Sequence, residues 1–147
     1  MNGASIAVKL PVVAHVSLVR NDAVLLARRV NTGFEDGNYG LVGGHLEAGE
    51  TIIQAAVREC WEEVGVQLEP SDLQIIGVTH CTSLTGDGID FFLRAERWAG
   101  EPFAKAECDG LCWCALDRLP QNTVPFVRRA LGHHLFNGAW FDETDWT

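Results

Sequence analysis

The chain has 147 residues and a formal net charge of −9, with 47% apolar and 21% charged residues. This length suits one domain with a real hydrophobic core. The acidic balance argues against a nucleic-acid duplex or an anionic membrane as partner, although bound cations can reverse the local sign for a small anionic ligand. No apolar run approaches the roughly 20 residues of a membrane span, and the N-terminus lacks a secretory signal. The sequence therefore predicts a single cytoplasmic domain over residues 1–147.

The N-terminal half of the chain predicts three strands and one helix. Asn21-Asp22 is a turn signal between two valine-rich runs, which together are typical of a β-hairpin. Residues 31–38 are polar and contain glycine, so they predict a loop. Apolar residues then recur at helical spacing from Thr51, and Gly65 is expected to end this helix. The expected strands cover residues 12–20, 23–30 and 39–42.

The C-terminal half predicts further strands, a second helix and a tail. Helical spacing favours a helix over residues 123–136, with His133 and His134 as a cationic C-terminus. The acidic residues 142–147 are expected to form a mobile tail. Strands combined with two substantial helices indicate an α/β or α+β fold. The expected strands cover residues 73–82, 89–98 and 111–116.

The five cysteines, an odd number, lie mostly in apolar surroundings. This usage is typical of buried thiols in a reducing compartment rather than of a disulfide framework. Cys108, Cys112 and Cys114 are close in sequence, but no second close pair follows at the spacing of a zinc finger or ribbon. The sequence therefore predicts buried free thiols, with a structural zinc site as the weaker alternative.

Residues 43–66 hold the glutamates that carry most of the functional information. On a helical wheel with about 100° per residue, the apolar side chains of residues 52–64 gather on one side. Glu59 and Glu63 fall at the edge of this apolar stripe, whereas Glu62 faces solvent. Carboxylates held at such an edge are partly desolvated and need partners. An ordinary acidic helix surface is the alternative explanation for the three glutamates.

A hard divalent cation is the partner that this arrangement favours. Arg58 is expected to pair with only one or two of the carboxylates, and the remaining oxygen ligands suit Mg²⁺ or Mn²⁺. Gly43-Gly44 before the helix lets the backbone approach a ligand closely, so a bare carbonyl there can complete a metal shell. The sequence therefore predicts a metal site built from carboxylates.

The spacing of these residues resembles a known family signature. Gly44, Glu50 and the run Arg58-Glu59-Cys60-x-Glu62-Glu63-x-Gly65-Val66 match the Nudix box, GX5EX7REUXEEXGU, at every fixed position. Cys60 stands at an aliphatic position, which a small hydrophobic thiol can fill. Val42 stands where the family often has proline. By this resemblance the whole chain adopts a Nudix fold, an α/β/α sandwich with a mixed β-sheet between helices.

The resemblance also implies a reaction and a set of site residues. The reaction is hydrolysis, assisted by Mg²⁺ or Mn²⁺, of a nucleoside diphosphate linked to another group X. Glu50 and Arg58 look like the pair that braces the preceding loop against the helix, and Glu59 is a candidate general base. Nudix domains often form homodimers, which is the protein partner that the resemblance implies. The metal ligands that it implies are the Gly43 carbonyl, Glu59, Glu62 and Glu63.

A second stretch is similar to MutT-type nucleoside triphosphate pyrophosphohydrolases. It comprises residues 96–102 and Lys105, and in those proteins an acid shortly after the lysine reaches the metals. Glu107 is the nearest candidate here, with a plain loop glutamate as the alternative. Asn122 lies near where such enzymes use an asparagine on the base, although a helix N-cap explains it equally well. Aromatic candidates to stack a base are Phe34, Tyr39 and Phe126, with simple packing as the alternative for each.

The leading hypothesis is Mg²⁺-dependent cleavage of a small nucleotide. A nucleoside triphosphate, including an oxidised one, would give a nucleoside monophosphate and pyrophosphate. A nucleotide-sugar or ADP-ribose-type pyrophosphatase is the alternative enzyme. A non-catalytic nucleotide-binding regulatory module is the alternative from another class, and the intact set of glutamates argues against it. Specificity is expected to depend on the loops around Phe34, Asp87 and Asn122, because one fold hosts many substrates.

Overall fold

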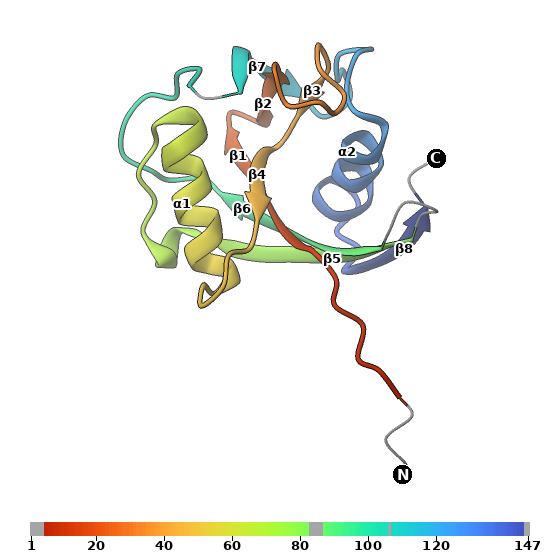
Figure 1. Ribbon diagram of the computed structural model, residues 1–147. Coiled ribbons are helices and arrows are strands. Elements are labelled where there is room, and N and C mark those ends of the chain that lie inside the picture. The colour runs from red at the N-terminus through yellow and green to blue at the C-terminus, as the bar shows by residue number, and fades with distance from the viewer. Residues whose placement is uncertain (1–4, 83–86, 106, 146–147) are drawn as a thin grey trace.

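A mixed β-sheet lies between two helical layers in the computed structural model, which describes residues 5–82, 87–105 and 107–145 (Figure 1). The strand order is β3-β2-β1-β6-β5-β8, with β4 paired to β1 and β7 paired to β2. The β1–β6 and β5–β8 pairs are parallel and the other pairs are antiparallel. The predicted α/β fold with a mixed sheet is therefore confirmed. The strands are β1 (Val12–Arg20), β2 (Ala23–Arg29), β3 (Tyr39–Gly40), β4 (Val42–His45), β5 (Gln74–Thr82), β6 (Gly88–Ala95), β7 (Cys108–Ala115) and β8 (Phe141–Asp145).

The helical segments cover opposite faces of the sheet (Figure 1). One face carries α1 (Ile52–Val64), which the 3₁₀ turn η1 (Pro70–Asp72) follows. The other face carries α2 (Pro125–Ala130) and its π-helical continuation η2 (Leu131–Phe136). Because side chains alternate along a strand, the sheet supplies two separate cores. The α1 core includes Ala14, Val16, Leu18, Cys60 and Val64, and the α2 core includes Val24, Leu26, Phe92, Phe126 and Leu131.

Local sequence signals set the hairpin and the ends of α1. Asn21 and Asp22 have φ values of 53° and 62°, the left-handed pair that a two-residue hairpin turn requires. The Thr51 hydroxyl accepts a hydrogen bond from the Gln54 backbone N–H, and the Gln54 side chain accepts one from the Thr51 N–H, which completes a capping box. Gly65, with φ of 70°, ends the helix as expected.

Several element boundaries differ from those predicted. The glycine pair at 43–44 lies inside strand β4 rather than beyond the predicted strand end at residue 42, because β4 pairs with β1 along its whole length. Strand β7 begins at Cys108, three residues before the predicted start, because Arg29 of β2 pairs with Cys108. The last helix begins at Pro125 instead of residue 123, since proline has no N–H and tolerates the first helical turn.

The acidic C-terminal residues are not a mobile tail over most of their length. Residues 141–145 form β8, which adds to the edge of the sheet in parallel with β5, and residues 146–147 lie outside the described part of the chain. Asp142 is buried and accepts two hydrogen bonds from the Arg129 guanidinium, at 2.8 and 2.9 Å. This pairing offsets the cost of placing an acid on a buried strand position.

Two predictions about polar and sulfur side chains are also corrected. Cys112 and Cys114 are joined by a disulfide, because residues two apart in a strand point to the same face. The other three cysteines are free, as predicted. His134 is not a cationic helix end: its Nδ1 donates to the Ala139 carbonyl, its Nε2 accepts from the Thr79 hydroxyl, and burial lowers its pKa.

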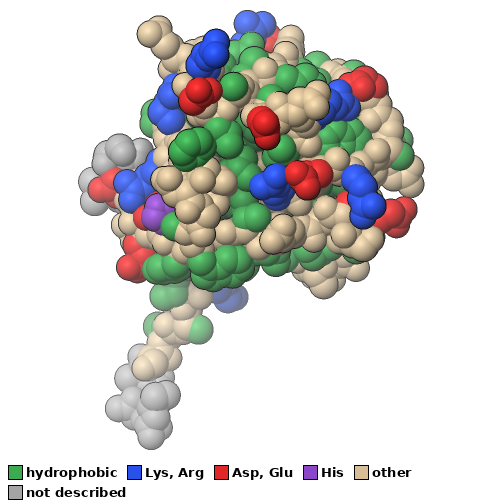
Figure 2. Space-filling model, turned by 180° about the vertical axis from the view of Figure 1, so that it is seen from behind, with side chains coloured by type: hydrophobic (Ala, Val, Ile, Leu, Met, Phe, Trp, Pro, Cys, Tyr) green, Lys and Arg blue, Asp and Glu red, His purple; other side chains and the backbone are tan. Residues whose placement is uncertain are grey.

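Charged side chains of both signs are interspersed with apolar ones on the surface. On the face in Figure 2, acidic and basic side chains alternate around apolar patches without a continuous basic stripe among the described residues. None of the described helices combines the length and apolar character that crossing a bilayer requires. Residues 5–9 extend away from the body and are exposed (Figure 1).

Candidate active site

Two glycines let three elements meet closely at one end of the sheet. In the β1–β4 register, Gly43 lies opposite His15 and Gly44 lies opposite Ala14. A Cβ atom on Gly43 would collide with the Ala14 carbonyl of β1, and one on Gly44 would collide with the Glu59 carboxylate of α1. Gly43 therefore requires glycine because the backbone of β1 approaches it closely, whereas at Gly44 the missing side chain leaves room for the Glu59 carboxylate against the backbone of β4.

The glutamates of α1 are buried to different extents, following the helical wheel. The Glu59 side chain is 14% exposed and the Glu62 side chain is 54% exposed. Glu63 is partly buried, and its Oε2 accepts a hydrogen bond of 2.7 Å from the Gly43 N–H. Thus Glu59 and Glu63 point toward the glycine strand, whereas Glu62 lies at the rim.

Burial disfavours the ionised forms of Glu59 and Glu63 in the absence of a cation. Burial raises the pKa of Glu63 to about 8, opposed by the hydrogen bond from Gly43 and reinforced by the charge of Glu59. Burial also raises the pKa of Glu59, opposed by its hydrogen bond from Arg58. A cation placed between these groups would favour their ionised forms.

Arg58 connects the loop before α1 to the carboxylates. Its Nε and Nη2 donate to the two oxygens of Glu50 at 2.6 and 3.0 Å, and Nη2 also donates to the His45 carbonyl at 3.0 Å. Its Nη1 donates to Glu59 at 2.7 Å and to Glu62 at 3.2 Å. Arg58 thus hydrogen-bonds to three carboxylates and lies 3.6 Å from a fourth, that of Glu47, which is more than the one or two expected. The forked pairing lowers the pKa of Glu50.

Glu107 reaches the same region because the segment before it caps α1. The Phe103 and Lys105 N–H groups donate to the carbonyls of Val64 and Glu63 at 3.0 and 3.1 Å. These bonds satisfy acceptors that a helix C-terminus leaves unpaired. Glu107 then adopts a left-handed φ of 59°, and its negative charge contributes to the raised pKa of Glu63.

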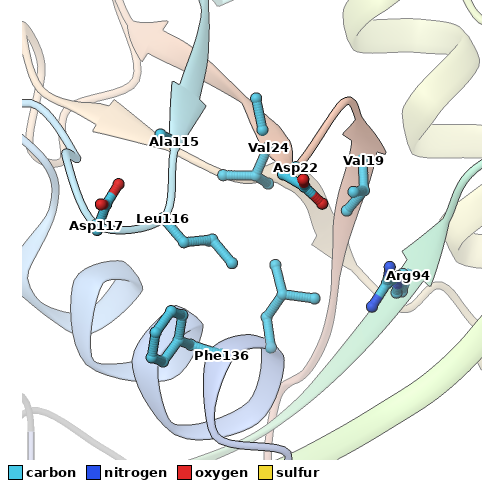
Figure 3. Close-up of a pocket in the computed structure, with 10 residues that line it drawn as sticks. Val19, Asp22, Val24, Arg94, Ala115, Leu116, Asp117 and Phe136 are labelled. Carbon is cyan, nitrogen blue, oxygen red and sulfur yellow. The ribbon is translucent and has the colours of Figure 1, made fainter.

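A cavity of about 600 Å³ joins these groups. It is lined by residues from β1, β2, β4, α1, the loop at 31–38 and the start of β7. A second cavity of about 440 Å³ lies on the same strands near the other end of β1, with a mainly apolar lining and no glutamate (Figure 3). The first cavity is therefore the candidate active site, because the predicted site residues line it: Glu59, Glu62, Glu63, Glu107, Gly43 and Gly44.

Of the three residues predicted to bind substrate, one lines the cavity and two lie outside its lining. Phe34 lines the cavity, with the Arg29 guanidinium 5.3 Å from its ring centre. Tyr39 and Asn122 do not line it. The Tyr39 N–H donates to the Asn122 carbonyl at 2.7 Å, and the Asn122 side-chain amide donates to the Gly37 carbonyl at 3.0 Å. Asn122 thus anchors the 31–38 loop.

Two further cavity residues were not predicted from the sequence. Arg29 supplies a cation to a cavity otherwise rich in acids, and its Nε donates to the Phe34 carbonyl at 2.7 Å. His15 interrupts a valine-rich strand, which is the signal in the sequence that could have found it. Its position on β1 becomes meaningful only once β4 and β6 are placed beside it.

The sequence profile of the NUDIX domain family matches residues 9–134, which is most of the chain. The chain belongs to the Nudix family. A MutT NUDIX hydrolase from Burkholderia pseudomallei superimposes with a TM-score of 0.77 and 29% identity, over 84% of this chain and 97% of that one. The Nudix fold expected from the box is therefore confirmed over nearly the whole described domain.

Two of the similar curated proteins have different names. The NAD-capped RNA hydrolase NudC of Pseudomonas aeruginosa is 35% identical over 123 residues, covering 83% of this chain. The chain spans 41% of that relative's length. The 8-oxo-dGTP diphosphatase of Escherichia coli is 29% identical over 117 residues, covering 80% of this chain and 88% of that protein.

The donor atoms of this Nudix site suit a hard divalent cation. Carboxylate and carbonyl oxygens are the ligands that Mg²⁺ and Mn²⁺ prefer, and here they are partly desolvated in one cavity. Within the described ranges, no three His, Cys, Asp or Glu side chains converge into a ready-made cage. The reason lies in their present partners: Arg58 holds Glu59 and Glu62, and the Gly43 N–H holds Glu63. Each of these bonds uses one carboxylate oxygen, so the second oxygen of Glu59, Glu62 and Glu63 could still face a cation.

Proposed function

We propose that this Nudix domain hydrolyses the pyrophosphate bond of a nucleoside diphosphate linked to a group X, with Mg²⁺ or Mn²⁺ as cofactor. A nucleoside triphosphate, cleaved to a monophosphate and pyrophosphate, is the leading substrate class. The observation that carries the proposal is the joint placement of Glu59, Glu63 and Glu107 in one cavity with Arg29 and Phe34. The name of the E. coli relative, which this chain matches over 88% of its length, supports the triphosphate class.

The residues of the chain have distinct proposed roles. Glu59, Glu62, Glu63 and the Gly43 carbonyl would hold the cation, and Glu107, which lines the same cavity, would be a further ligand. When bound, the cation supplies neutralisation of phosphate charge and a lowered pKa for a bound water. Arg58 orients Glu59 and secures Glu50 of the preceding loop. Glu59 is the candidate proton acceptor, because a carboxylate next to the reacting water can act as general base.

Other residues that line the cavity would bind the rest of the nucleotide. The Arg29 guanidinium is the basic group there and suits phosphate oxygens. Phe34 offers an aromatic face for a base, since stacking on aromatic side chains tolerates different bases. An extended pyrophosphate compound is the second candidate substrate, because NudC is named for acting on NAD-capped RNA and is 35% identical to this chain.

A substrate panel tests the proposal. The purified protein is incubated with Mg²⁺ and nucleoside triphosphates, 8-oxo-dGTP, ADP-ribose, a nucleotide sugar and NAD, and the products are identified by chromatography. We expect a nucleoside monophosphate from at least one triphosphate and no product when Mg²⁺ and Mn²⁺ are chelated. Tight nucleotide binding without hydrolysis of any compound would instead favour a regulatory binding module.

A further inference from the structure

His15 is a polar residue on the wall of the candidate cavity that has no part in the glutamate site. It lies on β1, between β4 and β6, with Gly43 opposite on one side and Phe92 opposite on the other. Its side chain is 15% exposed, so it reaches the cavity through one part of its ring while the rest is covered. A histidine in this position needs either a structural or a ligand-binding explanation.

The imidazole ring is fixed in place by a carboxylate and two aromatic rings. Nε2 lies 2.7 Å from Oδ1 of Asp90, which is 2% exposed on the neighbouring strand β6. The Phe92 ring stacks on the imidazole with a centroid distance of 4.7 Å and an angle of 10°. The Phe126 ring lies 6.0 Å away in a tilted orientation. The ring therefore has little freedom to turn.

The partner of Nε2 decides which hydrogen-bonding role the other ring nitrogen has. A carboxylate accepts hydrogen bonds, so Nε2 carries the hydrogen and Nδ1 of the neutral imidazole presents a lone pair. Asp90 also interacts with the Cys81 thiol, so its carboxylate is held from two sides. Among the described residues, the hydrogen bond of the His15 ring is made by Nε2. The Ser17 hydroxyl is the one buried side-chain polar atom without a partner in that part of the chain, so Nδ1 of His15 is not buried and is accessible to a ligand.

We propose that His15 binds the nucleoside part of the substrate through Nδ1, which accepts a hydrogen bond from a base N–H or a sugar hydroxyl. Asp90 is the positioning residue that fixes the tautomer. This inference rests on the proposed function. Fully ionised phosphate oxygens carry no hydrogen, so a lone pair at Nδ1 disfavours the phosphate end. The phosphate end is instead expected beside Glu59 and Glu63, where a cation would hold it.

Two substitutions separate binding by Nδ1 from a purely structural role. In His15→Gln the side-chain amide nitrogen can replace Nε2 and keep the bond to Asp90, but no acceptor remains at the Nδ1 position. In His15→Asn the amide oxygen can replace Nδ1, but the bond to Asp90 is lost. We therefore expect His15→Gln to raise KM for the best nucleotide of the panel about tenfold, with a smaller change in kcat and a wild-type melting temperature. His15→Asn should show the reverse, with a lower melting temperature and a KM closer to wild type.

The matched control is His133→Gln. His133 does not line the cavity, and its Nε2 contacts the Phe141 carbonyl. Its KM should equal that of the wild type. Analogues of the best nucleotide that lack the 2′-hydroxyl, the 3′-hydroxyl or the exocyclic amino group distinguish the two donor sources. The analogue without the bonded donor should show the same KM with wild type and His15→Gln.

The outcomes distinguish this inference from the proposed function. Hydrolysis by the wild type together with a wild-type KM for His15→Gln would overturn the role of His15 and leave the proposed function intact. If KM rises in both variants only to the extent that their melting temperatures fall, the role of His15 is structural, and this result would also overturn the inference. Absence of hydrolysis of every compound by the wild type would remove the proposed function and this inference with it.

Discussion

Glu63 has the most constrained surroundings of the candidate site residues. It is partly buried on α1, accepts a hydrogen bond from Gly43 at 2.7 Å, and lies near the negative charges of Glu59 and Glu107. Burial raises its pKa to about 8 from an ordinary value of 4.5. In this environment the ionised carboxylate is unfavourable on its own, and a bound cation would stabilise it.

The raised pKa of Glu63 predicts a pH dependence of stability in the cation-free protein. Between about pH 4.5 and pH 8, the folded protein holds a proton on Glu63 that the unfolded chain has released. The free energy of unfolding should therefore fall as pH rises through this window, by at most about 1.4 kcal/mol per pH unit. Urea unfolding with EDTA at several pH values measures this slope.

Glu63→Gln is the control for that slope, because an amide does not titrate. The variant should lose the Glu63 contribution to the pH dependence between pH 5 and pH 8. Identical slopes for wild type and variant would show that Glu63 ionises normally in the folded protein. Added Mg²⁺ should reduce the slope in the wild type, since cation binding favours the ionised carboxylate.

At the scale of elements, Arg58 makes α1 and the preceding loop one unit. Five of its contacts go to the Glu50 carboxylate, the His45 carbonyl, Glu59 and Glu62. A planar guanidinium can make these bonds at once, whereas an ammonium group cannot form the fork to Glu50. The loop position and the orientation of Glu59 therefore depend on the same side chain.

Arg58→Lys should keep the charge but lose this connection. We expect the free energy of unfolding to fall by about 1–3 kcal/mol and turnover to fall as well. Arg97→Lys is the matched control, since the Arg97 side chain is 84% exposed and lies 3.9 Å from its nearest acid. Chemical denaturation and steady-state kinetics on both variants measure the difference. Equal effects of the two substitutions would contradict the role given to Arg58.

The elements that could be predicted from sequence are those whose signals are local. Strand β1, the Asn21-Asp22 turn and helix α1 each carry their pattern within a short stretch, and each lies where it was expected. Strand β8 could not be predicted, because its acidic sequence becomes a strand only through pairing with β5 and through Arg129. The disulfide between Cys112 and Cys114 likewise required knowing that β7 extends through both.

The candidate site likewise contains residues that local sequence signals predict and residues that only the fold brings together. Its glutamates and glycines follow one another in a single stretch, so their spacing was sufficient to predict them. The other cavity residues could not be predicted from spacing, because His15 and Arg29 come from two strands and Asp90, which holds His15, comes from a third. Asn122 shows a similar limit: its position in the sequence suggested a base contact, and only the structure shows that its amide bonds to the Gly37 carbonyl of the 31–38 loop.

At the scale of the whole molecule, the C-terminal segment joins the edge of the sheet to the α2 layer. The Val78 N–H of β5 donates to the Trp140 carbonyl at 2.8 Å, and β8 continues the pairing. Arg129 of α2 binds Asp142, and His133 of η2 contacts the Phe141 carbonyl at 2.8 Å. Removing this segment would expose the β5 edge and free the end of η2.

Ending the chain at Gly138 should therefore destabilise the domain. The loss of several hydrogen bonds and one ion pair is expected to cost at least about 2 kcal/mol, or roughly 4–8 °C in melting temperature. Removing residues 1–8 is the control, because residues 5–8 are exposed and make no strand. Thermal unfolding followed by circular dichroism compares the two truncations. An unchanged melting temperature for the C-terminal truncation would mean that β8 does not support the fold.

The turnover of Glu59→Gln and Glu63→Gln tests most directly whether Glu59 and Glu63 hold the catalytic cation. Each variant is assayed with Mg²⁺ and the best nucleotide of the panel, beside Glu143→Gln, whose side chain is 69% exposed on β8. We predict that kcat falls at least about 100-fold in the two site variants while their far-ultraviolet circular dichroism is unchanged. The control should retain wild-type kcat. Wild-type kcat in either site variant would contradict the assignment of its carboxylate.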